Sequence, residues 1–260
     1  MQKRHLQFIS FILKKHMMQK FIIPEIKVLP TKASVIGQDA KHIFKVLRKK
    51  KGDNIAITDG KGKDYNSIIL NATPESIKIQ IIEKSDSISE SFIDITLCSG
   101  MLKDKKMDFV IKHITQLGVQ KWMPFFCERS IPSPDTRKME KRKKRWESIA
   151  KESLKQCNRS CLPDISEPMS FETLIKKSES HDLKIAFWEK SNQKIKALQN
   201  SVSPKKIIIL IGPEGGFSKK EILMAKEKRF LSYSLGPRIL RAETASIASC
   251  TLIQHLFGDI

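Results

Sequence analysis

The chain has 260 residues, of which 40% are hydrophobic, enough to bury the core of one large domain or of a small and a medium one. Its formal net charge of +20 favours a polyanionic partner, because each Lys or Arg that meets a phosphate releases counterions. A lysine- and isoleucine-rich proteome would give the same excess. No apolar run approaches the roughly 18–20 residues that span a bilayer, so no membrane partner is expected.

Cysteine usage argues against a disulfide framework and against a metal site. The 5 cysteines are odd in number and lie mostly within apolar segments, as in proteins of a reducing cytosol. Cys157 and Cys161 lie close in sequence, but no second Cys or His pair completes a zinc site. We therefore expect a cytoplasmic protein that binds no metal.

Residues 1–20 are interpreted as an N-terminal extension. Residues 8–13 form a short apolar run between basic residues, too short for the core of a signal peptide. Met17 and Met18 directly precede the apolar run that starts at Phe21. The hypothesis is that the native start lies at these methionines, and mass spectrometry of the endogenous protein would test it.

Residues 21–84 are expected to form a small β-barrel, because several short β-branched runs alternate with turn residues. Strands are expected over residues 54–59, 65–70 and 76–82. A helix is expected over residues 39–48, with Ile43, Val46 and Leu47 on one face. The polar, turn-rich residues 85–91 are interpreted as a linker.

Residues 92–260 are expected to form a second domain, in which strands alternate with helices. Strands are expected at 93–98, 119–126, 184–188, 206–211 and 231–236. Helices are expected at 104–117, 135–157, 193–199, 218–229 and 244–257, the fourth opening with a capping box from Ser218 to Glu221. This alternation predicts a parallel sheet and an α/β fold class. Trp122, Trp146 and Trp188 are expected in the core.

The first of two Gly-Pro loops reads Gly212-Pro213-Glu214-Gly215-Gly216. Its glycines let a ligand approach the backbone, and the helix that follows offers free N–H groups. The loop lacks the Gly-Lys-Ser/Thr ending of a P-loop and the spacing of a dinucleotide fingerprint, so neither class is favoured. Taken alone, this loop is equally consistent with a ligand-binding loop and with a tight strand–helix turn that binds no ligand.

The second loop changes this balance. It reads Gly236-Pro237-Arg238-Ile239-Leu240-Arg241-Ala242-Glu243-Thr244 and places two arginines and a glutamate before a helix. Arginine donates in a planar fork that suits phosphate or an enolate oxygen. The alternative is a surface Arg–Glu pair with Thr244 capping the helix. Because the carboxyl ends of parallel strands share one edge, the two loops predict one small-molecule pocket.

With these residues in view, the chain resembles the RsmE-type ribosomal RNA methyltransferases of the SPOUT class over residues 20–260. The resemblance rests on short motifs spread along the chain and on both Gly-Pro loops. The short motifs are His42 with Val46-Leu47-Arg48, Gly52-Asp53, Lys106-Met107-Asp108, Leu117-Gly118-Val119, Glu128-Arg129-Ser130, Arg145-Trp146, Gln156 with Arg159 and Pro163, and Phe257-Gly258-Asp259.

The resemblance implies a PUA-like RNA-binding β-barrel at residues 21–84 and a trefoil-knotted SPOUT domain at residues 92–260. It implies a homodimer that uses S-adenosylmethionine to methylate N3 of one uridine in 16S ribosomal RNA of the small ribosomal subunit. The cofactor-binding residues that it implies are Leu210, Ile211, Gly212, Glu214, Gly215, Leu235, Gly236, Ile239, Leu240 and Thr244. Positions such as His113 and Gln116 depart from the family pattern, so we assign no role to the helix at 104–117.

Catalysis is expected to depend on Arg241 and Glu243. Methyl transfer from a sulfonium is an in-line displacement that needs no metal, but uracil N3 is a weak nucleophile until its proton leaves. A guanidinium stabilises the resulting anion, and a carboxylate accepts the proton, directly or through water. The hypothesis gives the first role to Arg241; Glu243 assists deprotonation or orients Arg241. Because N3 lies on the Watson–Crick edge, the target must be unpaired or flipped out.

RNA contact is expected from basic residues on both domains. Most residues of 137–145 are basic, including Arg142 and Lys143, which suits a phosphate-tracking helix or, alternatively, a solvated face. Residues 48–51 form a second basic cluster, on the barrel, from which Arg48 and Lys49 are expected to contact RNA. Arg129 is expected to reach the RNA or a partner subunit. Two other functions stay open: a non-catalytic RNA-binding or ribosome-assembly factor, and a knotted methyltransferase that acts on transfer RNA.

Overall fold

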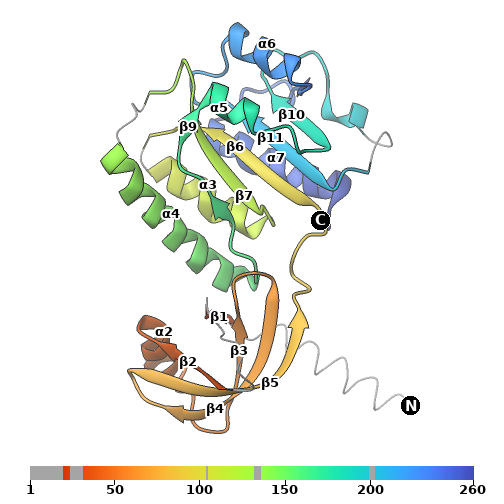
Figure 1. Cartoon of the computed structure of the whole chain (residues 1–260). Helices are drawn as coiled ribbons and strands as arrows, with labels where there is room; N and C mark the ends of the chain where they lie inside the picture. The colour runs from red at the N-terminus through yellow and green to blue at the C-terminus, as the bar shows by residue number, and fades with distance from the viewer. Residues whose placement is uncertain (1–19, 24–31, 104, 132–135, 199–202) are drawn as a thin grey trace, which may run out of the picture. The chain divides into compact units, whose positions relative to one another are not determined.

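The computed structural model of the chain describes residues 20–23, 32–103, 105–131, 136–198 and 203–260 (Figure 1). The prediction about residues 1–20 therefore falls almost wholly outside the described residues. Contacts divide the chain into two units, the first containing residues up to Glu90 together with Leu154–Leu162. The second unit contains Ser91–Ser153 and Pro163–Ile260. The sequence had assigned residues 154–162 to the second domain, whereas their contacts are with the first unit.

The first unit is built on a five-stranded sheet in the order β1-β3-β4-β5-β2. The strands are β1 (Lys20–Ile22), β2 (Lys32–Ile36), β3 (Asn54–Thr58), β4 (Lys63–Ala72) and β5 (Ser76–Asp86). β1 pairs with β3 in parallel and the other pairs are antiparallel. Alternate residues of β3 and β5 are isoleucines, which pack into one core with Phe21 and with Tyr65 and Ile69 of β4. β5 runs into the expected linker as far as Asp86.

The expected helix over residues 39–48 is instead a short helix followed by a π-helical turn. α2 (Gln38–Lys41) leads into η1 (His42–Val46), where the Leu47 N–H donates to the His42 carbonyl at 3.0 Å. This i→i+5 winding rotates residues off the 3.6-residue period. Ile43 is buried as expected, but Val46 and Leu47 are 64% and 38% exposed, so the predicted apolar face was wrong.

Residues 154–162 are held in the first unit by buried polar contacts. The Arg159 Nε and Nη2 atoms donate to Glu90 Oε2 at 3.0 and 2.8 Å. Glu90 Oε1 accepts from the backbone N–H groups of Ser160 and Cys161. Lys20 Nζ donates to both Asp64 Oδ2 and Ser160 Oγ at 2.8 Å. This segment therefore completes the polar interior of the unit.

The second unit is built on a parallel sheet in the order β12-β10-β11-β6-β7-β8, with β9 also paired to β7. Its strands are β6 (Asp94–Gly100), β7 (Lys121–Phe126), β8 (Asp164–Ile165), β9 (Met169–Ser170), β10 (Leu183–Phe187), β11 (Lys206–Ile211) and β12 (Leu231–Tyr233). Its helices are α3 (Lys105–Gln116), α4 (Thr136–Cys157), α5 (Phe171–Lys176), η2 (Ile195–Leu198), α6 (Lys219–Glu227) and α7 (Ala242–Phe257). The sequence did not predict β8, β9 or α5. The last residues of α4, from Leu154 to Cys157, belong to the first unit.

Helices cover both faces of this sheet (Figure 1). α3, α4 and α7 supply side chains to one buried cluster, and α5 and α6 supply the other. β11 feeds both clusters in alternation, Ile207, Ile209 and Ile211 on one side and Ile208 and Leu210 on the other. The parallel α/β architecture is confirmed; the trefoil knot stays a prediction. The loops after β10, β11 and β12 all leave from the carboxyl edge of the sheet, where ligands of such folds bind.

Candidate active site

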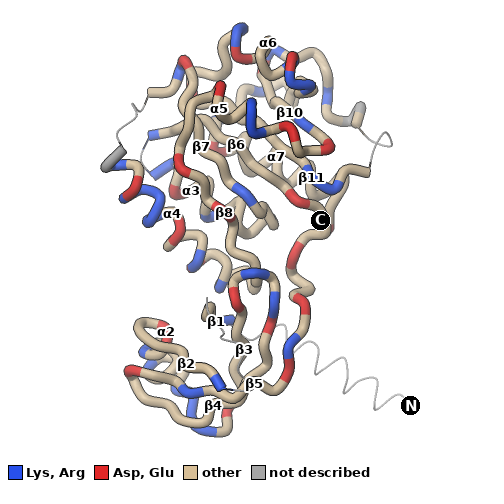
Figure 2. The backbone as a smooth tube through the Cα atoms, in the orientation of Figure 1, with Lys and Arg blue, Asp and Glu red and all other residues tan. Residues whose placement is uncertain are grey.

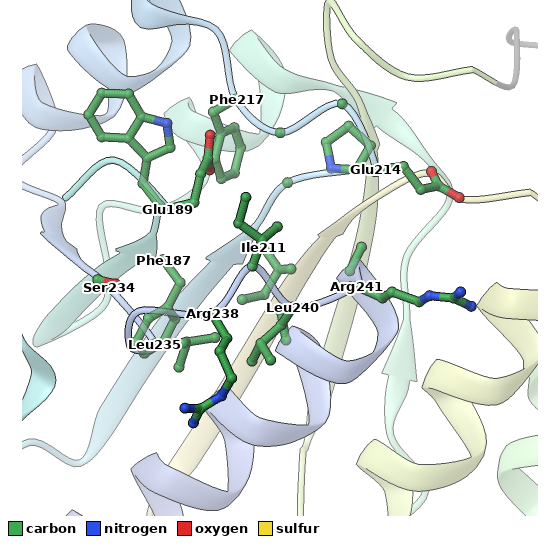
Figure 3. A pocket seen from close by; sticks show the side chains of 18 of the residues that line it. Phe187, Glu189, Ile211, Glu214, Phe217, Ser234, Leu235, Arg238, Leu240 and Arg241 are labelled. Atoms are coloured by element: carbon green, nitrogen blue, oxygen red, sulfur yellow. The ribbon is translucent and has the colours of Figure 1, made fainter.

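A cavity of about 660 Å³ lies at this carboxyl edge (Figure 3). Its size falls in the range of small-molecule sites. The walls come from the ends of β10 and β11, the glycine loop after β11 and the loop between β12 and α7. The lining residues are Lys106, Phe187, Trp188, Glu189, Ile211, Gly212, Pro213, Glu214, Gly215, Gly216, Phe217, Ser234, Leu235, Gly236, Arg238, Ile239, Leu240, Arg241, Ala242 and Ala245.

The structure brings together most of the residues that sequence reasoning assigned to the cofactor. Those that line the cavity are Ile211, Gly212, Glu214, Gly215, Leu235, Gly236, Ile239 and Leu240. Leu210 and Thr244 do not line it. The side chain of Leu210 is fully buried because β11 alternates and turns it toward α5 and α6. Thr244 is exposed in the first turn of α7, which begins at Ala242, two residues earlier than expected.

The two expected catalytic residues lie in different surroundings. Arg241 is exposed, occupies the N-cap position of α7 and lines the cavity. Glu243 is partly buried, does not line the cavity, and its Oε2 is a buried atom without a hydrogen-bond partner in the described chain. Residues two apart at a helix start point in different directions. Accordingly, no ion pair joins Arg241 and Glu243 among the described residues.

Close approaches fix the shape of the glycine loop. A Cβ on Gly100, the last residue of β6, would lie 2.5 Å from the backbone nitrogen of Pro213. A Cβ on Gly215 would lie 2.8 Å from the Cβ of Arg129. Gly216 has φ +66°, which side chains rarely adopt, and it packs against the carboxylate of Glu189. These positions need glycine because neighbouring chain segments occupy the space of a side chain.

Two cationic side chains from other segments contact the glycine loop. Lys106, in the first turn of α3, forms an ion pair of 3.0 Å with Glu214. Arg129, in the loop after β7, donates from Nη1 to the Gly215 carbonyl oxygen at 3.1 Å. The predicted capping box at the start of α6 is confirmed, and Glu221 also accepts from the Glu128 N–H at 2.9 Å. Arg129 thus has a contact within its own unit that the sequence did not predict.

Sequence reasoning missed several residues of the cavity. They are Lys106, Phe187, Trp188, Glu189, Phe217 and Ser234. Trp122 and Trp146 are buried as expected. Trp188 is partly buried: it packs against the second core cluster, as expected, and also lines the cavity, which the sequence did not predict. The sequence does contain a signal for the residues at the end of β10. Because β10 and β11 are parallel strands of one sheet, the carboxyl end of β10 must lie at the same sheet edge as the glycine loop.

The residues expected to contact RNA lie on the surface of their own units. Arg48 is exposed, with φ +51°, and Lys49 is partly buried. On α4, Arg142 and Lys143 are partly buried, and Arg145 pairs with Asp108 at 2.6 Å. Figure 2 shows Lys and Arg along much of α4. The positive charge is thus present at the expected positions, but no contact in the structure identifies RNA as the molecule that these residues bind.

The described part of the chain shows neither a metal site nor a membrane-spanning helix. Within the described ranges, no group of three His, Cys, Asp or Glu side chains is placed to hold a metal ion. None of the helices that the structure describes is both long and apolar enough to cross a membrane.

Comparison with known proteins identifies the family. The family model of the RNA methyltransferase domain matches residues 89–254, and that of the RNA methyltransferase PUA domain matches residues 35–82. Ribosomal RNA small subunit methyltransferase E of Bacillus subtilis is 30% identical over 248 residues, covering 92% of this chain and 96% of the relative. The chain belongs to this methyltransferase E family. Its Buchnera aphidicola member, from the pea-aphid strain APS, is 34% identical and covers 85% of this chain and 87% of the relative.

Solved methyltransferase structures share this fold. The Neisseria gonorrhoeae enzyme bound to S-adenosylmethionine has a TM-score of 0.84 at 28% identity, covering 94% of this chain and 99% of that chain. A Legionella pneumophila methyltransferase with the same bound cofactor has a TM-score of 0.83 at 27% identity, with the same coverage. The resemblance indicated by the sequence motifs is therefore confirmed, including the PUA-like first unit and the methyltransferase second unit.

Proposed function

We propose that the chain uses S-adenosylmethionine to methylate N3 of a uridine in the 16S RNA of the small ribosomal subunit. The observation that supports this most directly is the cavity, which both Gly-Pro loops line together with Arg241. The Neisseria gonorrhoeae family member and the Legionella pneumophila methyltransferase, which share this fold, bind S-adenosylmethionine. The family name gives small-subunit RNA as the substrate, and N3 of uridine is the position that suits the chemistry of Arg241.

The cavity fits this cofactor. Phe187, Ile211 and Leu235 offer apolar walls for a nucleobase, and the glycine loop leaves backbone groups accessible. Ile239 is 86% exposed at the cavity, an unusual state for an isoleucine and one that an apolar ligand group would relieve. When bound, S-adenosylmethionine supplies a methyl group on a sulfonium, which a nucleophile displaces in line.

The role of this chain's residues is to prepare the nucleophile. Removing the N3 proton of uracil spreads negative charge over O2 and O4, and the always-charged guanidinium of Arg241 stabilises that charge as it develops. Glu243 is the nearest carboxylate in sequence, but it does not line the cavity and its Oε2 is buried, so a part in deprotonation requires its side chain to turn toward the cavity. Without an ion pair to Glu243, Arg241 is free to turn toward the base.

The charge of +20 supports delivery of the RNA. Basic residues on both units would contact phosphates, among them Arg48, Lys49, Arg142 and Lys143. A homodimer would add the basic surface of a second copy around each site. The reaction would take place in the cytoplasm without a metal, and the target uridine must be unpaired or flipped out.

The deciding experiment measures methyl transfer from S-adenosylmethionine to small ribosomal subunits, to naked 16S RNA and to bulk transfer RNA, followed by nucleoside analysis. We expect 3-methyluridine in the ribosomal RNA. Transfer to transfer RNA instead would assign the knotted transfer-RNA alternative, and RNA binding without transfer would assign a non-catalytic assembly factor.

The same assay tests Arg241. Arg241→Ala should lower turnover by on the order of 100-fold with little change in cofactor affinity, because the guanidinium acts on charge that develops in the transition state. Lys219→Ala, an exposed residue on α6, serves as the control. Wild-type turnover in Arg241→Ala would refute this role.

A further inference from the structure

Two glutamates line the cavity, Glu189 and Glu214, and they differ in whether a cationic side chain pairs with them. Glu214 forms an ion pair with Lys106 at 3.0 Å. Glu189 follows the end of β10, is exposed and lines the cavity, and no Lys, Arg or His of the described chain forms an ion pair with it. A charged acceptor without a cationic partner, facing a ligand cavity, is available to bind donors on the ligand.

The position of this carboxylate is set by Gly216. A Cβ at Gly216 would lie 3.3 Å from Glu189 Oε1 and 3.4 Å from Oε2, so both oxygens lie against the glycine loop. Any side chain at position 216 would press on the carboxylate, and the φ of +66° there already disfavours one. Because Gly216 has no side chain, the carboxylate lies beside the glycine loop while Glu189 stays exposed at the cavity.

Glu189 and Arg241 lie on opposite sides of the cavity, with Glu214 on the side of Arg241 (Figure 3). The methyl group must be delivered beside Arg241 if that residue stabilises the uracil anion. The nucleoside part of the cofactor then extends toward the other side, where Phe187 and Leu235 supply apolar surface near Glu189. The donors on that part of the molecule are the adenine amino group and the two ribose hydroxyls, and only the vicinal hydroxyls offer two separate donor groups side by side to the two oxygens of one carboxylate.

We propose that Glu189 binds the 2′- and 3′-hydroxyls of the cofactor ribose, one through each carboxylate oxygen. An ionised carboxylate accepts from two donors at once, and such charge-assisted bonds are stronger than bonds between neutral groups. Glu189 is thus a specificity-determining residue that selects a ribonucleoside over analogues lacking these hydroxyls. The inference rests on the proposed function, because it takes S-adenosylmethionine as the ligand.

The test is a calorimetric cycle of variants against ligands. The variants are wild type, Glu189→Ala and the control Glu227→Ala, an exposed glutamate on α6 that does not line the cavity. The ligands are S-adenosylmethionine, 5′-methylthioadenosine, which lacks the amino-acid part, and 2′,3′-dideoxy-5′-methylthioadenosine. We expect Glu189→Ala to weaken binding of the first two ligands equally, by on the order of 10-fold, and to leave binding of the dideoxy ligand unchanged. Glu227→Ala should match wild type throughout.

Three results would overturn the inference in distinguishable ways. Equal affinity of wild type and Glu189→Ala for every ligand would remove Glu189 from the site while leaving the proposed function standing. A loss seen with S-adenosylmethionine but absent with 5′-methylthioadenosine would place the carboxylate at the cofactor's ammonium group instead. Wild type that binds none of the three ligands would overturn the proposed function itself, and this inference with it. Thermal unfolding of each variant confirms that the exposed substitution leaves the fold intact.

Discussion

Arg129 and Gly215 join the loop after β7 to the glycine loop after β11. The guanidinium donates to the Gly215 carbonyl oxygen at 3.1 Å, and the missing Cβ of Gly215 allows the two residues to approach. The same arginine is an expected RNA contact. The structure therefore offers it a second role, as a positioning residue for the loop that we propose to bind the cofactor.

Arg129→Ala distinguishes these roles. If the arginine positions the loop, losing a hydrogen bond worth about 1 kcal/mol should weaken S-adenosylmethionine binding roughly 5-fold and leave RNA affinity unchanged. Calorimetry with the cofactor and filter binding with RNA measure the two quantities. Weakened RNA binding with unchanged cofactor affinity would assign Arg129 to the RNA alone.

Gly100→Ala should lower the free energy of unfolding by about 1–3 kcal/mol, because its Cβ would meet the backbone and ring of Pro213 at 2.5–2.6 Å and neither can move alone. Gly215→Ala is the matched comparison. There a Cβ would lie 2.8 Å from the Cβ of Arg129 and 3.2 Å from its carbonyl oxygen, so the two loops must move apart. Because this clash is milder than the one at Gly100, stability should fall less, while the displaced glycine loop lowers cofactor affinity. Urea unfolding with and without S-adenosylmethionine separates the two effects, and equal stability losses would contradict this reasoning.

Neutralising the basic face of α4 should weaken RNA binding and flatten its salt dependence. Replacing Lys141, Arg142, Lys143 and Lys144 by Gln removes up to four phosphate contacts, each worth about 0.7–0.9 in the slope of log K against log salt concentration. Cofactor affinity is the internal control. An unchanged salt slope would show that this helix face is merely solvated.

Glu90→Gln should destabilise the protein by about 3 kcal/mol, because it leaves the buried guanidinium of Arg159 without its counter-charge. The side chains of Arg159 and Glu90 are 3% and 15% exposed. Lys63→Gln is the control, since it breaks an ion pair with Asp86 on the surface of the same unit and should change stability little. Chemical unfolding measures both variants, and similar losses would refute the distinction.

His181 should make stability fall as the pH drops below about 6.5. Burial lowers the pKa of its imidazole, although the Ser178 carbonyl and Asp94 oppose the shift. The unfolded chain then binds a proton at a pH where the folded chain does not, so stability is lost as pH falls through the window below the unfolded pKa. His181→Gln should flatten the curve over that window in urea unfolding between pH 5 and 7.5. His255→Gln, an exposed residue of α7, should leave it unchanged.

The sequence predicted the second unit well where hydrophobic patterns are long. β11 and α6 lie close to their expected bounds, since a continuous run of isoleucines and a capping box are strong local signals. β8 and β9 have only two residues each, too few for any period, and they exist because they pair with β7. Tertiary pairing alone creates such strands.

The candidate site was predictable to the extent that it consists of loop backbone. The glycine loop and the loop before α7 carry their own signatures, so eight of the expected cofactor residues line the cavity. Residues that reach it from elsewhere, such as Lys106 and Glu189, have no local signature. Their roles depend on which strand ends are neighbours, which only the sheet order β12-β10-β11-β6 reveals.

The first unit is assembled from two separate stretches of sequence, and this limits how the protein can be divided. A fragment ending at Glu90 would keep Glu90, Lys20 and Asp64 but lose Arg159 and Ser160, the partners that neutralise and satisfy them. The fragment that begins at Ser91 would contain Arg159 and Ser160 without Glu90 and Lys20, with which they form hydrogen bonds. Exchange of this RNA-binding module between relatives, in the laboratory or in evolution, must therefore move residues 154–162 together with the N-terminal stretch.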